Sequence, residues 1–273
     1  MSRNPNSPYP KSMTPRALVL ALVAMASVLL FSPPAAVADD VKAPADFVAL
    51  SSVDHSIIQE IRYATPHNFV GAPVNGYLQP MCILTKPAAL ALHHVQLKLL
   101  RTGYSLKVYD CYRPQRAVDN FVSWAEDLTD QTMKGEFYPD ENKADLFTDG
   151  YIAAKSGHSR GSTMDLTIVK LPATKTRAYV PGEPLVPCYA DQAARFPDNS
   201  VDMGTGFDCF DTLANTLDPR ITGVQLANRL QLKNAMEAAG FTNLAVEWWH
   251  YTLTNEPYPA TYFDFPITPS SLT

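Results

Sequence analysis

The sequence is poor in glycine, in basic residues and in long apolar segments. Its 273 residues include only 12 glycines against 23 prolines, which indicates stiff connections rather than flexible linkers. Lys and Arg number 22 against 27 Asp and Glu, so the basic face that nucleic-acid-binding proteins use for phosphates is not expected. No internal repeat is evident. The hydrophobic fraction of 46% is that of a globular chain.

The first residues have the pattern of a secretory signal peptide. Three basic residues precede an apolar run over residues 17–31, and Ala36-Val37-Ala38 then supplies small residues for cleavage. A membrane anchor is the alternative, but this run is shorter than the ~20 residues that span a bilayer. We therefore expect a signal peptide over residues 1–38, a domain over residues 39–273, and a periplasmic or secreted protein without membrane contact. Cleavage leaves 19 Lys and Arg against 27 Asp and Glu, a net charge of −8.

Export changes how the four cysteines are interpreted. In an oxidising compartment Cys82, Cys111, Cys188 and Cys209 are expected to form disulfides. A zinc site made of all four is the alternative, but no pair has the C-x2-C or C-x4-C spacing of such sites. Four cysteines allow three pairings, and the sequence does not choose among them. We prefer Cys82 with Cys111 and Cys188 with Cys209, because each pair closes a local loop.

The order of strand and helix patterns predicts one mixed α+β domain. Val118, Phe121, Val122 and Ala125 have the spacing of one apolar helix face. Strands are expected at residues 57–63, 105–109 and 165–169, and helices from Thr85 to Leu100, after Pro114, and from Val224 to Ala239 with Arg229, Lys233 and Glu237 on a polar stripe. A long loop over residues 64–80 and a proline-rich excursion over residues 171–197 lie between them.

Two histidines have neighbours that suggest chemistry. His158 is flanked by glycines, and Asp165 opens an apolar strand, where a buried carboxylate needs a positive partner. A cation held by both side chains would meet that need, although backbone hydrogen bonds to Asp165 are an equal alternative. Glu247 and His250 lie three residues apart around two tryptophans, and they can converge only if the chain turns or bulges there. An aromatic core strand with a surface glutamate is the alternative here.

Taken together, the two elements are more specific than either alone. Two imidazoles and one carboxylate leave a fourth position open for water, as in a catalytic zinc site. A further glutamate can take a proton from that water. Arg113, at a strand-to-helix junction, could stabilise an oxyanion, although taken alone an ordinary salt bridge, for example to Asp110, is the favoured interpretation.

Three motifs carry a resemblance to a known family. S-x-H-S-R-G-S-x-x-D from Ser156 to Asp165, E-W-W-H-Y from Glu247 to Tyr251, and D-x-Y-R-P from Asp110 to Pro114 are similar to those of the zinc D-alanyl-D-alanine dipeptidases of the VanX type. Further agreement runs in order from Arg62-Tyr63-Ala64-Thr65 to the ending Tyr262-Phe263-Asp264-Phe265-Pro266. The resemblance covers nearly all of the chain after residue 38.

The resemblance implies one Zn²⁺ ion per chain, held by His158, Asp165 and His250. It implies that Glu247 is the general base and then acid, and that Arg113, oriented by Asp110, stabilises the tetrahedral intermediate. Three further positions match substrate contacts of the family: Asp208 for the free amino group, Ser156 near the carboxylate, and the pocket tyrosine Tyr63. The implied fold is a single compact domain with a small central antiparallel sheet flanked by helices, as in D,D-peptidases and the hedgehog domain.

The chain departs from the family pattern at three places. Gly157 replaces a common serine, the segment over residues 181–203 is longer than in short relatives, and Cys111 replaces a small residue beside Arg113. A disulfide at Cys111 would brace the loop that carries Arg113.

Three hypotheses follow from the motifs and the resemblance. The first is hydrolysis of the D-alanyl-D-alanine dipeptide to two D-alanines, with this small D,D-dipeptide as the only partner. The second is a D,D-carboxypeptidase that trims longer peptidoglycan stem peptides with the same metal chemistry. The third is a binding module with structural zinc, which would need neither Glu247 nor Arg113. Cell-wall turnover, D-alanine salvage and glycopeptide resistance would all use the first reaction, and the oligomeric state is not specified by these motifs.

Overall fold

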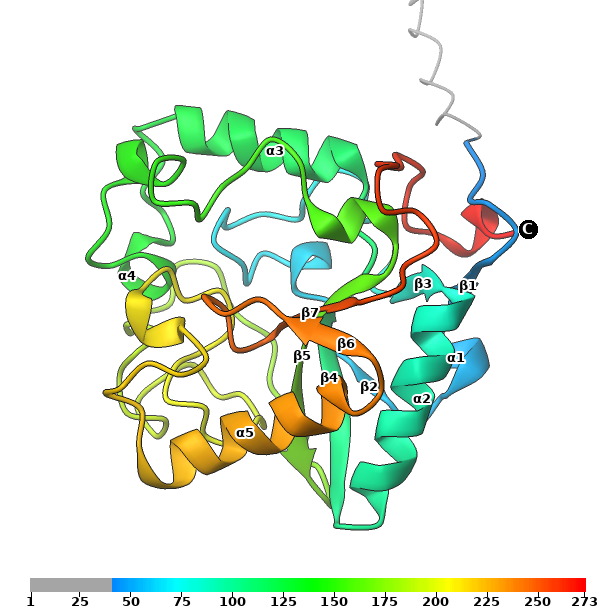
Figure 1. The fold of residues 1–273 in the computed structure, drawn as a ribbon. Coiled ribbons are helices and arrows are strands. Elements are labelled where there is room, and N and C mark those ends of the chain that lie inside the picture. The colour runs from blue at the N-terminus through cyan, green and yellow to red at the C-terminus, as the bar shows by residue number, and fades with distance from the viewer. Residues whose placement is uncertain (1–40) are drawn as a thin grey trace, which may run out of the picture. The chain divides into compact units, whose positions relative to one another are not determined.

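The fold is described from a computed structural model that covers residues 41–273. The predicted signal peptide at residues 1–38 lies outside these described residues. A five-stranded sheet in the order β2-β4-β5-β7-β6 occupies the centre (Figure 1). Its strands are β2 (Ile58–Gln59), β4 (Tyr104–Asp110), β5 (Thr163–Lys170), β6 (Phe241–Asn243) and β7 (His250–Leu253). Three pairs are antiparallel and β2 runs parallel to β4, so the expected antiparallel sheet carries one parallel edge.

Helices lie around this sheet, as the α+β prediction requires. The helices are α1 (Leu50–Val53), α2 (Lys86–Leu100), α3 (Gln115–Glu126), α4 (Lys134–Phe137) and α5 (Gly223–Glu237). A separate antiparallel pair, β1 (Phe47–Ala49) with β3 (Ile83–Thr85), adjoins α2. Helix α2 packs against β4 and also contacts α5, while α3 lies across the sheet from α5 (Figure 1). Among the described residues, no helix combines the length and apolarity needed to span a bilayer.

Helix α3 follows the predicted apolar spacing closely. Val118, Phe121 and Ala125 are buried, and Trp124 extends the same face. Helix α5 ends at Glu237, two residues before the predicted Ala239, and Gly240 beyond it has the positive φ of +89° that is common after a helix.

Two predictions about local structure are wrong. The strand expected over residues 57–63 is reduced to β2, and the chain turns into a 3-10 helix at Arg62–Ala64. The turn places Arg62 in the interior, where its guanidinium pairs with Asp198 at 2.6 Å. Arg229 was expected on a polar stripe but is buried, because its guanidinium donates to the backbone carbonyls of Met203, Leu213 and Asn215. These carbonyls lie outside the α-helices and strands, and they need a donor when buried.

Both preferred disulfides are present. Cys82 pairs with Cys111, and Cys188 pairs with Cys209. The first links the start of β3 to the loop after β4. The second lies within the long irregular stretch between β5 and α5, where the described chain has no strand and only one short 3-10 helix, Thr212–Ala214. Each disulfide therefore fixes chain that the sheet does not hold.

Candidate active site

Three side chains that could hold a metal ion meet at one end of the central strands. The ligand atoms of His158, Asp165 and His250 all lie within 4.8 Å of one another. His158 Nε2 is 3.3 Å from Asp165 Oδ1, and His250 Nδ1 is 3.1 Å from the same oxygen. The two imidazole nitrogens are 3.3 Å apart. The fold therefore brings together the three residues that the sequence indicated.

Strand register accounts for two of these positions. Asp165 of β5 lies opposite His250, the first residue of β7, and opposite Asp110, the last residue of β4. The register between β4 and β5 shifts between Val108 and Asp110, an irregularity that re-aims the side chains beyond it. Asp110, Asp165 and His250 thus form one row across three neighbouring strands, where facing residues are close enough to interact.

His158 comes from a 3-10 helix, Gly157–Arg160, immediately before β5. The Ser156 hydroxyl caps this helix by accepting from the His158 backbone N–H at 3.3 Å. The His158 ring donates from Nδ1 to the carbonyl oxygen of Cys111 at 2.8 Å, which leaves the Nε2 lone pair directed at the cluster. Gly161 then turns the chain into β5 at φ +83°, with a Cβ there only 2.2 Å from the Phe47 ring.

The three ligand atoms have the spacing that a tetrahedral metal ion requires. Ligands bound at about 2.0–2.1 Å in a tetrahedron lie about 3.3 Å from one another. The separations of 3.1–3.3 Å between His158, Asp165 and His250 match this value. Asp165 Oδ1 is buried and accepts no well-formed hydrogen bond, so a cation would satisfy it. The residues present therefore fit a metal ion.

The electrostatics of the cluster also favour a positive charge. Burial raises the pKa of Asp165, but the facing His158 and His250 outweigh burial and hold that pKa well below its ordinary value. Burial lowers the pKa of His250, whereas the neighbouring carboxylates of Asp165 and Glu247 raise it to about 9. A cluster that stabilises a protonated imidazole so strongly also provides a favourable position for a metal cation.

Glu247 lies at the rim of the cluster because the chain turns between β6 and β7. The His250 backbone N–H donates to the Glu247 carbonyl oxygen at 3.3 Å, which closes a turn over the two tryptophans. Glu247 Oε2 is 3.3 Å from His250 Nδ1, and its side chain is 28% exposed. This turn brings Glu247 and His250 together, and Trp248 and Trp249 are buried beneath it.

Arg113 extends towards the cluster from the junction between β4 and α3. Its Nε donates to Asp110 Oδ2 at 2.9 Å, and one terminal nitrogen lies 3.5 Å from Asp165 Oδ2. The guanidinium carbon lies 4.9 Å from the Tyr63 ring centre and 5.1 Å from that of Phe121, a cation-π arrangement that fixes its plane. Burial lowers the pKa of Arg113, but the surrounding Tyr63 and Asp110 raise it well above its ordinary value, so the group stays charged.

Asp208 and Tyr63 form a second polar group in the same cavity. The Tyr63 hydroxyl donates to Asp208 Oδ2 at 2.7 Å, and both side chains are buried. Burial, followed by the nearby Asp165, raises the pKa of Asp208 well above its ordinary value. A cation placed beside Asp208 would restore the ionised carboxylate, so this position suits a ligand ammonium group.

The candidate site residues share one cavity of about 220 Å³. It is lined by the three possible metal ligands together with Tyr63, Arg113, Ser156, Asp208 and Glu247, whereas Asp110 lies behind its wall. This volume is smaller than the roughly 300–1,000 Å³ of pockets for drug-sized ligands. Apolar side chains form much of the remaining wall, among them Phe69, Val118, Phe121, Ile152, Phe210 and Leu244. The cavity therefore suits a small ligand with charged ends.

Tyr77 is a neighbour of the site that sequence reasoning missed. Its hydroxyl donates to Asp110 Oδ1 at 2.6 Å, while Asp110 Oδ2 accepts from Arg113. Both oxygens of this fully buried carboxylate are thus occupied. Tyr77 lies in the long loop over residues 64–80, where nothing in the local pattern marks a buried tyrosine.

The fold and the site define a peptidase of a metal-dependent type. A family profile described as D-ala-D-ala dipeptidase matches residues 43–175 and 197–268. The D-alanyl-D-alanine dipeptidase of Streptomyces coelicolor is 38% identical over 222 residues, 81% of this chain and 98% of that protein. The Enterococcus faecalis D-alanyl-D-alanine dipeptidase is 37% identical with the same coverage, and that of Escherichia coli is 29% identical over 80% of this chain. The chain belongs to the D-alanyl-D-alanine dipeptidase family of the M15 peptidases.

Proposed function

We propose that this protein is a zinc-dependent dipeptidase that hydrolyses D-alanyl-D-alanine to two D-alanines. The observation that carries the proposal is the joint placement of the His158, Asp165 and His250 triangle and the Tyr63–Asp208 pair in one cavity of about 220 Å³. The first group fits a metal ion, and the second fits a free ammonium. A substrate that contacts both groups at once is therefore expected to be a small peptide.

His158 Nε2, Asp165 Oδ1 and His250 Nδ1 would hold the zinc ion. When bound, zinc lowers the pKa of a water molecule and polarises the substrate carbonyl. Glu247, at the rim beside His250, takes the proton as the water oxygen bonds to the peptide carbon. The same carboxyl then gives that proton to the leaving nitrogen as the C–N bond breaks. One product leaves with a new carboxylate and the other with a new amine.

Arg113 stabilises the negative charge that develops on the carbonyl oxygen. Its guanidinium is held in plane by the rings of Tyr63 and Phe121 and through Nε by Asp110. A donor fixed before the reaction needs no reorganisation as charge develops, which is the usual source of such stabilisation.

Asp208 receives the substrate's ammonium group, and Ser156 lies at the cavity wall where the substrate carboxylate is expected. The ion pair formed with the ammonium offsets the cost of burial, which raises the pKa of Asp208. A longer stem peptide has no free amine at this position, so Asp208 would be left buried without a positive partner from the substrate. The arrangement therefore favours the dipeptide over a D,D-carboxypeptidase substrate.

We place the protein in the periplasm or outside the cell. Two disulfides among buried cysteines support an oxidising compartment, and the amino-terminal pattern is that of a signal peptide.

The test is a zinc-replete assay with four substrates: D-Ala-D-Ala, an L,D-dipeptide, an L,L-dipeptide and a pentapeptide ending in D-Ala-D-Ala. We expect release of D-alanine from D-Ala-D-Ala, with a kcat/KM at least about 100-fold above that for the pentapeptide. Preference for the pentapeptide would instead assign the carboxypeptidase activity. Absence of any hydrolysis by protein containing one zinc per chain would contradict the proposal.

A further inference from the structure

The loop that carries Asp208 has an unusual backbone. Asp208 has φ +56° and is the single non-glycine residue with positive φ in the described chain. The left-handed region is costly for a residue with a side chain, and it persists where the surroundings enforce it. No regular strand or helix holds Asp208, because it lies in the irregular stretch between β5 and α5. Another constraint has to keep its carboxylate in the cavity.

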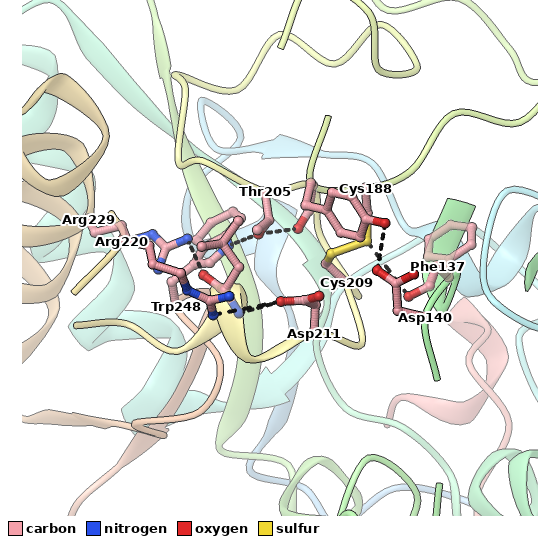
Figure 2. Close-up of a disulfide and its surroundings, with 12 residues drawn as sticks. Phe137, Asp140, Cys188, Thr205, Cys209, Asp211, Arg220, Arg229 and Trp248 are labelled. Atoms are coloured by element: carbon pink, nitrogen blue, oxygen red, sulfur yellow. Dashed lines mark hydrogen bonds and ion pairs between the residues drawn. A yellow bond between two sulfur atoms is a disulfide. The ribbon is translucent and has the colours of Figure 1, made fainter. Parts of the chain in front are cut away.

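A disulfide lies one residue away from Asp208. Cys209 is bonded to Cys188, and both are buried, with exposures of 1% and 3% (Figure 2). Cys188 comes from the proline-rich excursion, far from Asp208 along the irregular chain. The covalent link therefore joins the carboxyl side of Asp208 to a segment that is distant in the sequence.

Cys188 is itself attached to the protein by its backbone. Its N–H donates to the Glu136 carbonyl of α4 at 2.9 Å, and its carbonyl accepts from the Gly206 N–H at 2.7 Å. The Phe210 N–H donates to the Phe137 carbonyl at 2.8 Å. The loop around Asp208 is thus tied to α4 on both sides of the carboxylate, with Cys188 between them.

On the other side, the loop adjoins the turn that carries Glu247. The Trp248 indole N–H donates to the Thr205 hydroxyl at 2.8 Å (Figure 2). The disulfide therefore sits between α4 and a loop that reaches the proposed general base. A shift of this loop would change the distance between the ammonium-binding carboxylate and the reacting centre.

The disulfide is not explained by the family match. The matched ranges, 43–175 and 197–268, leave out the segment that contains Cys188. The matched residues carry the complete cluster, Asp208 and Cys209, so the disulfide joins a matched residue to one outside the match.

We propose that Cys188 and Cys209 are positioning residues whose disulfide holds Asp208 in place for the ammonium group of the substrate. The inference rests on the proposed function for the identity of the ligand. It predicts that breaking this disulfide weakens recognition of the amine and leaves the hydrolytic step largely intact.

The test compares two variants that each lack one of the two disulfides, Cys188→Ala/Cys209→Ala and Cys82→Ala/Cys111→Ala. Each is assayed with D-Ala-D-Ala and with N-acetyl-D-Ala-D-Ala, which lacks the ammonium group. For the first variant we expect KM for the dipeptide to rise about tenfold, with kcat within about threefold of the wild type. Its preference for the free amine should fall by a similar factor. The second variant disturbs Arg113 and the carbonyl that orients His158, so it should lower kcat on both substrates and keep the preference.

Amide hydrogen exchange provides a readout that does not depend on the substrate. Residues 205–210 should exchange about tenfold faster in the Cys188/Cys209 variant and at the wild-type rate in the Cys82/Cys111 variant. If the alanine pair fails to fold, the Cys82→Ala/Cys111→Ala variant assayed before and after reduction with a phosphine gives the same comparison of amine preference, because its one remaining disulfide is Cys188–Cys209. Unchanged exchange, or unchanged KM and amine preference, would overturn the inference even where the wild type hydrolyses the dipeptide. If the wild type cleaves a different peptide, the proposed function fails. The disulfide is then tested with that peptide and its N-acetyl form in place of D-Ala-D-Ala and N-acetyl-D-Ala-D-Ala.

Discussion

The two halves of the candidate site are held in different ways. Asp110, Asp165 and His250 occupy facing positions on β4, β5 and β7, so strand hydrogen bonds set their spacing. Asp208 lies in irregular chain at a positive φ, where the Tyr63 hydroxyl donates to its carboxylate and a disulfide follows at the next residue. A hydrogen-bonded ladder fixes the relative positions of residues that face each other on neighbouring strands. A binding residue on a loop needs additional constraints to reach similar precision.

The largest expected effect is at the sheet-borne half of the site, the row of Asp110, Asp165 and His250. Asp165→Asn keeps the shape of the side chain but removes the charge that faces His158 and His250. Because even outer-shell changes weaken metal binding about 10–100-fold, loss of this ligand should weaken zinc binding by more than about 100-fold. Zinc content after dialysis and dipeptide turnover check the result. An Asn variant that retains one zinc per chain and full activity would remove Asp165 from the ligand set.

A smaller effect is expected at Asp208, the part of the site that lies on a loop. Asp208→Asn leaves the Tyr63 hydroxyl a partner but removes the charge that faces the substrate's ammonium. We expect KM to rise by about 10–100-fold, since a buried charge-assisted pair is lost, while zinc content stays at one per chain. Steady-state kinetics on D-Ala-D-Ala gives the measurement. A drop in zinc content would show instead that the two halves are not separable.

Tyr77→Phe tests the hydrogen bond that Tyr77 donates to Asp110, one of the residues in the row across the sheet. The variant removes one of the hydrogen bonds to the buried Asp110 carboxylate, which itself orients Arg113. We expect kcat to fall about tenfold. Tyr112→Phe is a matched control, because that buried hydroxyl donates to the Phe265 carbonyl and not to the site. Equal kcat losses in both variants would indicate a general effect of removing a buried hydroxyl.

The smallest effect concerns stability away from the site. His67 is buried, and its ring bridges the Arg62 guanidinium and the Glu136 carboxylate. Burial lowers the pKa of His67 below its ordinary value. The unfolded chain then binds a proton more readily than the folded one, so stability is highest above the unfolded pKa and falls as the pH drops through the folded value.

His67→Gln should remove this part of the pH dependence. Between about pH 7.5 and about pH 5.5, the wild type should lose more free energy of unfolding than the variant does. Urea titrations with a chelator present isolate the effect from zinc loss. Parallel pH profiles for the two proteins would contradict the assignment.

Much of this arrangement was predictable from local sequence, and the failures have a common cause. The spacing of Val118, Phe121 and Ala125 predicted α3, and the loop lengths favoured the observed cysteine pairs. The three residues proposed as metal ligands lie in short motifs, and the fold brings them together. Local pattern says nothing about which residues face each other across strands, so the row through Asp110 and Asp165 was not foreseen.

Burial of polar groups was the other difficulty. The spacing of Arg229 fits a polar helix stripe, yet the residue is buried because its guanidinium donates to three backbone carbonyls. Tyr77 is likewise buried only because Asp110, in a distant strand, accepts its hydroxyl. Such partners are set by tertiary structure and leave no trace in the neighbouring sequence.

The central claim is that Glu247 moves the proton in a zinc-dependent hydrolysis of D-Ala-D-Ala. The direct test is D-alanine release by Glu247→Gln, with zinc content measured on the same sample and Glu237→Gln, on the exposed surface of α5, as the control. The account predicts one zinc per chain in all three proteins, full activity in the control, and a kcat about 10²–10⁴-fold lower in Glu247→Gln. Wild-type turnover by Glu247→Gln with zinc in place would contradict it.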